Sequence, residues 1–339
     1  MTTRIHLNPT AGSARAALAA LGATLAAALW PGAAALAQTD AAGYPDRAIR
    51  LIVPNAPGGT NDAVARIVAH QLELQLKKPL VVENRPGANG LIGYAAVANA
   101  APDGYTIMHT PPSLMINEFV SKDVRYGMKD FTPITNISLG NGYLIVTNTD
   151  GPIKTLADLK AAASTGKGLT YGSAGLGNTT QLASALLGAR LGVEMLHVPF
   201  KGIADAMNAV VAGNVDVVSA TPISALPFVK SGRLRAIAFT GAQRWSELPD
   251  IPTVAESYPG FEVIGAWLGW FGPKNMPPAI TARLQQEIAK ALQVPAVREA
   301  IEKGGQAPDG RSPEEFRKFL AVEEVRYRDA VKAAKITPQ

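Results

Sequence analysis

The sequence contains no cysteine, and histidine occurs only four times in 339 residues. The absence of cysteine excludes disulfide bonds, a thiol nucleophile and thiolate metal ligands, so the fold depends on its apolar core. His70, His109 and His197 show no metal-ligand spacing. The acidic residues form no arrangement typical of general acid–base catalysis. We therefore expect no metal ion, no cofactor and no catalytic residues.

An excess of one charge is missing as well. The chain has 32 Lys and Arg residues against 27 Asp and Glu residues, a formal net charge of +5 at pH 7. The basic residues are dispersed along the chain and form no basic block. Nucleic-acid-binding proteins concentrate positive charge on one face, so this distribution argues against a nucleic-acid partner.

Long apolar runs are absent except near the N-terminus. There a basic start leads into an Ala/Leu stretch at residues 16–29, and Ala35-Leu36-Ala37 has the A-x-A pattern of a cleavage site. This arrangement predicts a secretory signal peptide at residues 1–37, cut before Gln38, and a periplasmic location. An uncleaved membrane anchor is the alternative. Loss of the two arginines of this segment lowers the formal net charge from +5 to +3.

The remaining chain alternates between strand and helix patterns. Short β-branched runs at residues 49–53, 80–83 and 105–108 are separated by amphipathic segments at residues 63–76 and 91–100. Parallel neighbours need crossover helices, so this order predicts a parallel sheet with helices on both faces.

The same alternation recurs between residues 143 and 239, which indicates a second lobe. A mature chain of about 300 residues is also longer than a single hydrophobic core usually stabilises. We place the first lobe at residues 44–140 plus 268–339, because the helical patterns after residue 279 are expected to pack back on it, and the second lobe at residues 141–267. The expected fold is therefore α/β, with two doubly wound lobes and a ligand cleft between them.

Two glycine-rich turns follow strands, at residues 54–62 and 171–179. The first N–H groups of a helix lack internal partners and carry the positive end of its dipole, so each turn predicts a seat for a carboxylate or phosphate. In the first turn, Gly58 and Gly59 allow close backbone approach, and Thr60 can cap the helix. Asp62 suits a structural role in the first helical turn better than ligand contact.

The second turn carries hydroxyl and amide donors among its glycines. It lacks the third glycine of a dinucleotide fingerprint, and Tyr171 stands where a nucleophile elbow requires glycine. The aromatic segment at residues 265–271 lies on the path between the lobes. Core packing is the default for Trp267 and Trp270, but Trp267 is also a candidate for a wall of the cleft.

Several ordered motifs together resemble the Bug family, the extracytoplasmic substrate-binding proteins of tripartite tricarboxylate transporters. They span nearly the whole mature chain and stand at residues 54–62, 65–66, 82–90, 102–106, 130–133, 171–173, 197–202, 212–216 and 252–256. This resemblance implies a type II periplasmic binding protein-like receptor, a monomer whose two lobes close like a flytrap on a small carboxylate.

The resemblance also implies the ligand-binding residues, which belong to the two turns and their surroundings. They are Ala56, Gly58, Gly59, Thr60, Asp62, Ser173, Ala174, Gly175 and Thr179, with Phe200 at the pocket edge and Trp267 as the candidate wall. Three positions depart from the family pattern: Asn55, where an aromatic residue is usual, Phe200, where Tyr is common, and Thr180-Gln181, where Ser-His is frequent. These changes put the ligand class in question.

We hypothesise a receptor, not an enzyme, that delivers its ligand to a transporter's membrane subunits or to a sensor kinase. A periplasmic ligand sensor with no transport partner has the same pocket and remains an alternative. The rival from another class is an exported hydrolase that uses Ser173. It requires His109 or His197 within hydrogen-bond reach of the Ser173 hydroxyl, backed by a carboxylate.

Overall fold

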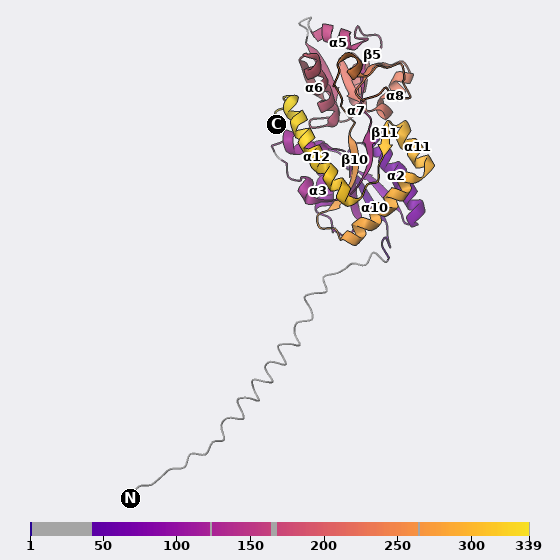
Figure 1. Ribbon diagram of the computed structural model, residues 1–339, viewed down its shortest axis with the longest axis vertical. Helices are drawn as coiled ribbons and strands as arrows, with labels where there is room; N and C mark the ends of the chain where they lie inside the picture. The colour runs from indigo at the N-terminus through magenta and orange to yellow at the C-terminus, as the bar shows by residue number, and fades with distance from the viewer. Residues whose placement is uncertain (2–42, 123, 164–167, 264, 339) are drawn as a thin grey trace. The chain divides into compact units, whose positions relative to one another are not determined.

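The computed structural model describes Met1 and residues 43–122, 124–163, 168–263 and 265–338 (Figure 1). The predicted signal peptide lies outside the described residues, apart from Met1. Ala41–Gln339 forms one compact unit. Within the described ranges, no helix combines the length and the hydropathy needed to cross a bilayer.

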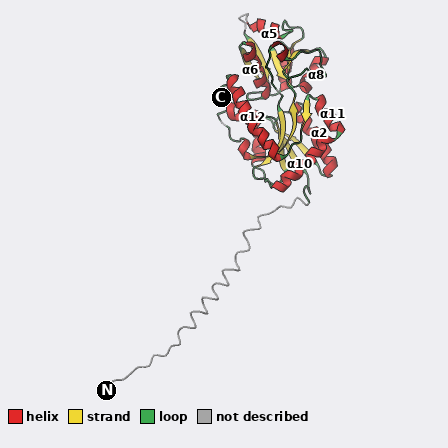
Figure 2. Cartoon of the chain, in the orientation of Figure 1, coloured by secondary structure: helices red, strands yellow, loops and turns green. Residues whose placement is uncertain are grey.

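Two separate sheets organise this unit, each flanked by helices as Figure 2 shows in yellow and red. The six strands of the first sheet are, in spatial order, β11 (Gln306–Pro308), β4 (Phe131–Gly140), β10 (Trp267–Pro273), β3 (Thr106–Thr110), β1 (Ile49–Val53) and β2 (Leu80–Asn84). The five strands of the second are β7 (Met195–Pro199), β6 (Leu169–Ser173), β8 (Val217–Ala220), β5 (Leu144–Asn148) and β9 (Leu234–Phe239). The alternation of strands and helices confirms the α/β class with two lobes.

The first lobe consists of the six-stranded sheet and the helices around it. These are α2 (Thr60–Leu76), the 3₁₀ turn η1 (Ala88–Gly90), α3 (Leu91–Ala98), α4 (Ser113–Val120), η2 (Met128–Asp130), α10 (Pro278–Gln293), α11 (Pro295–Lys303) and α12 (Pro313–Ala333). The second lobe consists of the five-stranded sheet and its helices. These are α5 (Leu156–Ala163), α6 (Thr179–Leu191), α7 (Ile203–Val211), α8 (Pro222–Lys230) and α9 (Val254–Ser257). The lobe limits at residues 140/141 and 267/268 stay a prediction.

The sheets are mixed rather than wholly parallel. Strand β1 pairs in parallel with β2 and β3, as the sequence pattern predicts. Strand β10, which the sequence analysis did not identify, runs antiparallel to both β3 and β4. In the second sheet β6 is parallel to β7 and β8, whereas β5 is antiparallel to β8 and β9. The expectation of a parallel sheet therefore holds only for the strands on one side of each lobe.

Strand β1 shows why the first sheet is covered on both faces. Leu51 and Val53 belong to the core cluster that contains α2 and α10, whereas Ile52, between them, belongs to the cluster that contains α4 and α12. Successive strand residues point to opposite faces, so the three residues 51–53 are all apolar and buried, whereas Arg50 near the start of the strand is exposed. Helix α12, yellow in Figure 1, packs on α4 and β4 and also contacts α6 of the second lobe.

The chain crosses between the lobes at two adjacent segments. The Gly140 amide donates to the Ala266 carbonyl at 3.0 Å, and a Cβ built on Gly140 would lie 2.7 Å from the Gly265 Cα. Only glycine allows two backbones to approach this closely. The crossing segments therefore form a thin, paired connection on which the two lobes are mounted.

Candidate ligand-binding site

A cavity of about 780 Å³ lies between the two lobes. The first lobe contributes residues 54–56 and 86–91 together with Asn117, Val120 and Ser121. The second lobe contributes residues 174–176 and 200–201. The carboxyl ends of β1 and β6 therefore face a shared crevice, where ligands bind in open α/β sheets.

Of the first-turn candidates, Ala56 lines the cavity, whereas Gly58 and Asp62 do not. The buried Asp62 carboxylate accepts hydrogen bonds from the Gly58 amide at 3.0 Å, from Arg66 Nε at 3.0 Å and from Asn84 Nδ2 at 2.9 Å. Burial raises the pKa of Asp62, but these hydrogen bonds outweigh burial and hold that pKa below its usual value. Asp62 thus fixes the turn from inside.

Gly59 and Thr60 also lie outside the cavity wall. Gly59 is the N-cap of α2, and no side chain caps this end of the helix. The Thr60 hydroxyl lies 2.6 Å from the hydroxyl of Thr221, the residue before α8 in the second lobe. Thr60 therefore makes a direct hydrogen bond between the lobes.

In the second turn, the predicted site residues Ala174 and Gly175 line the cavity. Their backbone N–H groups already donate hydrogen bonds within the protein. The Ala174 amide donates to Thr180 Oγ1 at 3.0 Å, and the Gly175 amide donates to Ser173 Oγ at 3.1 Å. The expectation that this turn bares those N–H groups is wrong, because short polar side chains near the helix start accept their hydrogen bonds.

Ser173 itself is fully buried and belongs to a chain of hydrogen bonds. Gln181 Oε1 accepts from the Gly177 amide at 2.7 Å, which orients the Gln181 amide group so that its Nε2 donates to His197 Nδ1 at 3.2 Å. His197 Nε2 then carries the proton and donates it to Ser173 Oγ at 2.6 Å. The Ser173 hydroxyl donates in turn to the Gly175 carbonyl at 3.1 Å.

This chain of hydrogen bonds meets one requirement of the rival hydrolase and fails the others. His197 reaches the Ser173 hydroxyl, but an amide rather than a carboxylate supports the ring. The tautomer also places the proton on the nitrogen that faces Ser173, so the imidazole cannot act there as a general base. Burial lowers the pKa of His197, which favours the neutral ring that the hydrogen bond from Gln181 Nε2 to Nδ1 requires.

The remaining candidates are separated. Phe200 lines the main cavity, but Thr179 lines a smaller cavity of about 170 Å³ beside Tyr143. Trp267 is 1% exposed and packs edge-on against Phe316 in the core of the first lobe. The alternative that Trp267 forms a wall of the cleft is therefore replaced by its default role in core packing.

Most residues of the cavity wall were missed as site residues, among them Asn89, Asn117 and Lys201. Asn89 Nδ2 donates to Asn117 Oδ1, and Asn117 Nδ2 donates to the Asn89 carbonyl. A Cβ built on Gly177 would lie 2.7 Å from Asn89 Nδ2. The cluster of turn-forming residues at 84–90 was the available signal for Asn89, since such turns carry function when a rigid scaffold positions them.

His109 lies deep in the first lobe and does not face Ser173. Its Nδ1 accepts from Trp270 Nε1 at 2.6 Å, so Nε2 carries the proton of the neutral ring. In the part of the chain that the structure describes, no group of three or more His, Cys, Asp or Glu residues could hold a metal ion.

The family model described as "Tripartite tricarboxylate transporter family receptor" matches residues 64–336. The chain belongs to this receptor family. It is also 33% identical over 298 residues to the protein BugT of Bordetella pertussis, covering 85% of this chain and 90% of BugT. These findings confirm the resemblance to the Bug family.

Solved structures of similar receptors share the fold. R. palustris Rpa4515 with adipate is 31% identical, with a TM-score of 0.83 over 87% of this chain and 100% of that chain. MatC from Rhodopseudomonas palustris with bound malate is 29% identical, with a TM-score of 0.78 over 85% of this chain and 100% of that chain. Both are similar to this receptor along almost all of its described length.

The stability of this receptor should fall in mild acid because of His109. Burial lowers its pKa from 6.5 to about 3. The unfolded chain binds the proton more readily, so the stabilisation is complete above about pH 6.5 and is lost as pH falls toward 3. Each pH unit in that window should lower the free energy of unfolding by about 1.4 kcal/mol.

This pH dependence can be measured by urea unfolding between pH 7 and pH 4.5. The difference in unfolding free energy between the parent protein and His109→Gln should shrink as pH falls. His70→Gln, which changes an exposed histidine, controls for the loss of a histidine as such. A difference that stays constant across this range contradicts a buried, neutral His109.

Proposed function

We propose that this protein is an extracytoplasmic solute receptor that binds a small organic carboxylate between its lobes and presents it to a membrane transporter. The observation that carries the proposal is the cavity of about 780 Å³, to which both lobes contribute. A ligand held there contacts both lobes, so it stabilises the closed arrangement over the open one. The structural neighbours with adipate and with malate support a carboxylate as the ligand.

Neutral groups can hold such a ligand. Among the described residues, the amides of Ala56 and Leu176 have no intramolecular acceptor, and both residues line the cavity. A hydrogen bond to an ionised group contributes about 1.5–3 kcal/mol, so a few such donors suffice without an arginine. In this proposal Ala56, Ala174, Gly175 and Phe200 form the wall, and Gly58, Gly59, Thr60, Asp62, Ser173 and Thr179 support the two turns.

The proposal includes the location of the receptor and its membrane partner. In this proposal residues 1–37 direct export, so the receptor acts in the periplasm. It binds its ligand without converting it. The thin connection at Gly140 and Gly265 lets the lobes, at residues 44–140 plus 268–339 and at residues 141–267, rotate about it. Membrane subunits of a tripartite tricarboxylate transporter then recognise the closed form.

Isothermal titration against a panel of carboxylates tests this function. We expect at least one mono-, di- or aromatic carboxylate to bind, with a matching rise in the thermal unfolding midpoint because the ligand binds only the folded state. The uncharged amides of the same acids serve as controls. Absence of binding across the whole panel contradicts the proposal.

Gly177→Ala should weaken ligand binding by about tenfold, or about 1.4 kcal/mol. The added Cβ would lie 2.7 Å from both Asn89 Nδ2 and Val120 Cγ2, so it pushes the second lobe away from the first. Gly192→Ala is the matched control, because Gly192 has the same φ of +70° and nothing within 4 Å of its Cβ position. Equal dissociation constants for the two variants, measured by titration, would show that this contact does not govern closure.

A further inference from the structure

One side chain of the cavity wall has a fixed orientation that leaves its hydrogen-bond donors free. Asn55 stands two residues after the end of β1 and lines the cavity. Its backbone carbonyl accepts a hydrogen bond from Asn84 Nδ2 at 3.1 Å, and its side-chain Oδ1 accepts one from Asn61 Nδ2 at 2.7 Å. Asn55 is therefore held through both its backbone and its side chain.

The carbonyl of His109 decides which way the amide group of Asn55 points. Asn61 Nδ2 also donates to this carbonyl, at 3.3 Å. A backbone carbonyl can only accept, so the NH₂ group of Asn61 must lie on this side of its amide. Because Asn61 presents a donor to Asn55, Asn55 must meet it with oxygen. The NH₂ group of Asn55 then occupies the other branch of the side chain.

This NH₂ group has no partner in the part of the chain that the structure describes. No hydrogen bond within those ranges starts from Asn55 Nδ2. The atom is also not one of the buried side-chain atoms that lack a partner. Asn55 Nδ2 therefore keeps its access to solvent, at a residue that lines the cavity, and its N–H groups are available to a ligand.

The next donor along the chain is the amide of Ala56, which lines the same cavity and has no intramolecular acceptor among the described residues. Adjacent Cα atoms lie about 3.8 Å apart, so a carboxylate on the Ala56 amide places the next carbon of the ligand near the Asn55 side chain. Asn55 can only donate to that carbon's substituent, because Asn61 occupies its oxygen. A carbonyl oxygen suits this donor better than a hydroxyl, whose own proton needs a further acceptor.

We propose that the ligand is a 2-oxo acid, and that Asn55 is the specificity-determining residue that donates a hydrogen bond to its oxo group while the Ala56 amide holds the carboxylate. Asn61 is a positioning residue, since it acts on the ligand through the orientation of Asn55. An acid without the oxo group displaces water from Asn55 Nδ2 and leaves the donor unpaired, which lowers the affinity. This inference rests on the proposed function, since it names the ligand class for the same cavity.

Titration with chain-matched acids tests the inference. Each series keeps one carbon skeleton and carries an oxo group, a hydroxyl or a methylene beside the carboxylate. The series are 2-oxobutyrate, 2-hydroxybutyrate and butyrate; 2-oxoglutarate, 2-hydroxyglutarate and glutarate; and benzoylformate, mandelate and phenylacetate. In the series whose skeleton fits the cavity, we expect the 2-oxo acid to bind more tightly than the hydroxy acid and at least tenfold more tightly than the unsubstituted acid.

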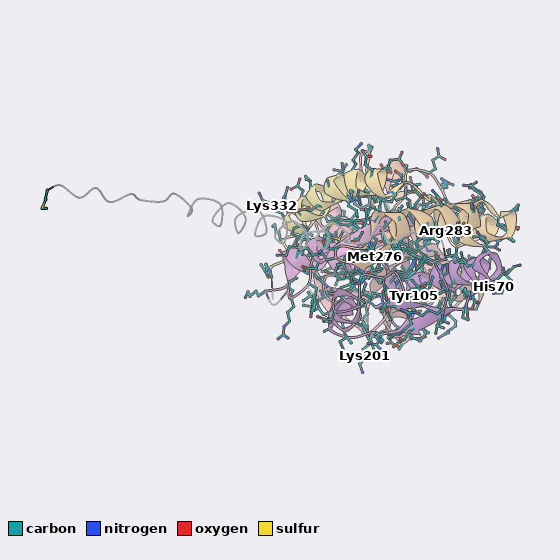
Figure 3. The ribbon with its side chains drawn as sticks, turned by 90° about the horizontal axis from the view of Figure 1, so that it is seen from below. His70, Tyr105, Lys201, Met276, Arg283 and Lys332 are labelled. Carbon is teal, nitrogen blue, oxygen red and sulfur yellow. The ribbon has the colours of Figure 1, made fainter. Side chains whose placement is uncertain are left out.

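The comparison within a series separates Asn55 from the charge of the wall. Lys201 is the one charged residue of the described wall, and Figure 3 shows it at the edge of the molecule. The three acids of a series carry the same charge at pH 7, so any contribution of Lys201 cancels between them. The ratio of their affinities therefore reports on the group beside the carboxylate.

Variants of Asn55 test the assignment to this residue. Asn55→Leu should bring the affinity ratio of the 2-oxo acid to the unsubstituted acid close to one. Asn55→Asp keeps an oxygen for Asn61 and replaces the NH₂ group by an acceptor. The 2-oxo acid should then lose at least tenfold more affinity than the hydroxy acid, whose hydroxyl can donate to the new oxygen.

Asn214→Asp is the matched control. It adds the same negative charge at an exposed position outside the cavity wall, so it should leave all three affinities unchanged. A variant that only loosens the first turn weakens the three acids of a series equally, whereas loss of the Asn55 donor changes their ratio.

The outcomes separate this inference from the function beneath it. The inference is overturned, and the carboxylate receptor stands, if an unsubstituted acid binds as tightly as the 2-oxo acid of its series. The same holds if only acids without an oxo group bind, or if Asn55→Leu weakens a whole series equally. If no acid binds at all, both proposals fail. The expected ranking, lost in Asn55→Leu and retained in Asn214→Asp, supports both.

Discussion

Beside the cavity, the turn at Gly177 of the second lobe lies against the paired amides of Asn89 and Asn117 of the first. A Cβ on Gly177 would lie within 3 Å of both members of the amide pair. Because Asn89 and Asn117 are hydrogen-bonded to each other, they form a firm surface rather than two mobile side chains. Backbone contact with a polar but internally satisfied surface therefore joins the lobes here, as the Thr60–Thr221 hydrogen bond and the contact of α12 with α6 do elsewhere.

In the second lobe, the hydrogen bonds around Ser173 fix the conformation of the turn that contains Gly177. One hydrogen-bond chain joins the Gly177 amide, Gln181, His197 and Ser173, and so ties α6 to two neighbouring strands. The Gly177 amide donates, and Gln181, His197 and Ser173 each donate one hydrogen bond and accept at least one. Such networks specify a single arrangement when every member is satisfied. An arrangement that resembles the serine–histidine pair of a hydrolase thus holds the turn at residues 173–177 in place.

Local sequence predicted the parts of this fold that are encoded locally. The strand at residues 49–53 and the helix that follows were found because their apolar residues repeat with the periods of a strand and a helix. Strand β10 was missed because Gly269 and Gly272 interrupt it, and only its partners β3 and β4 make it a strand. Antiparallel insertion from a distant part of the chain leaves no local periodicity, so the mixed character of the sheets could not be predicted.

The candidate site, too, could be predicted from the sequence only in part. Glycine-rich turns after β1 and β6 identified two walls of the cavity, since turn position follows from local composition. Whether their amides are free depends on side chains two to six residues away, and here Asp62, Ser173 and Thr180 accept from them. With these donors engaged, the amides of Ala56 and Leu176 are among the backbone donors of the described wall that stay free. The donors that the cavity offers therefore depend on the side chains around the turns as well as on the turns themselves.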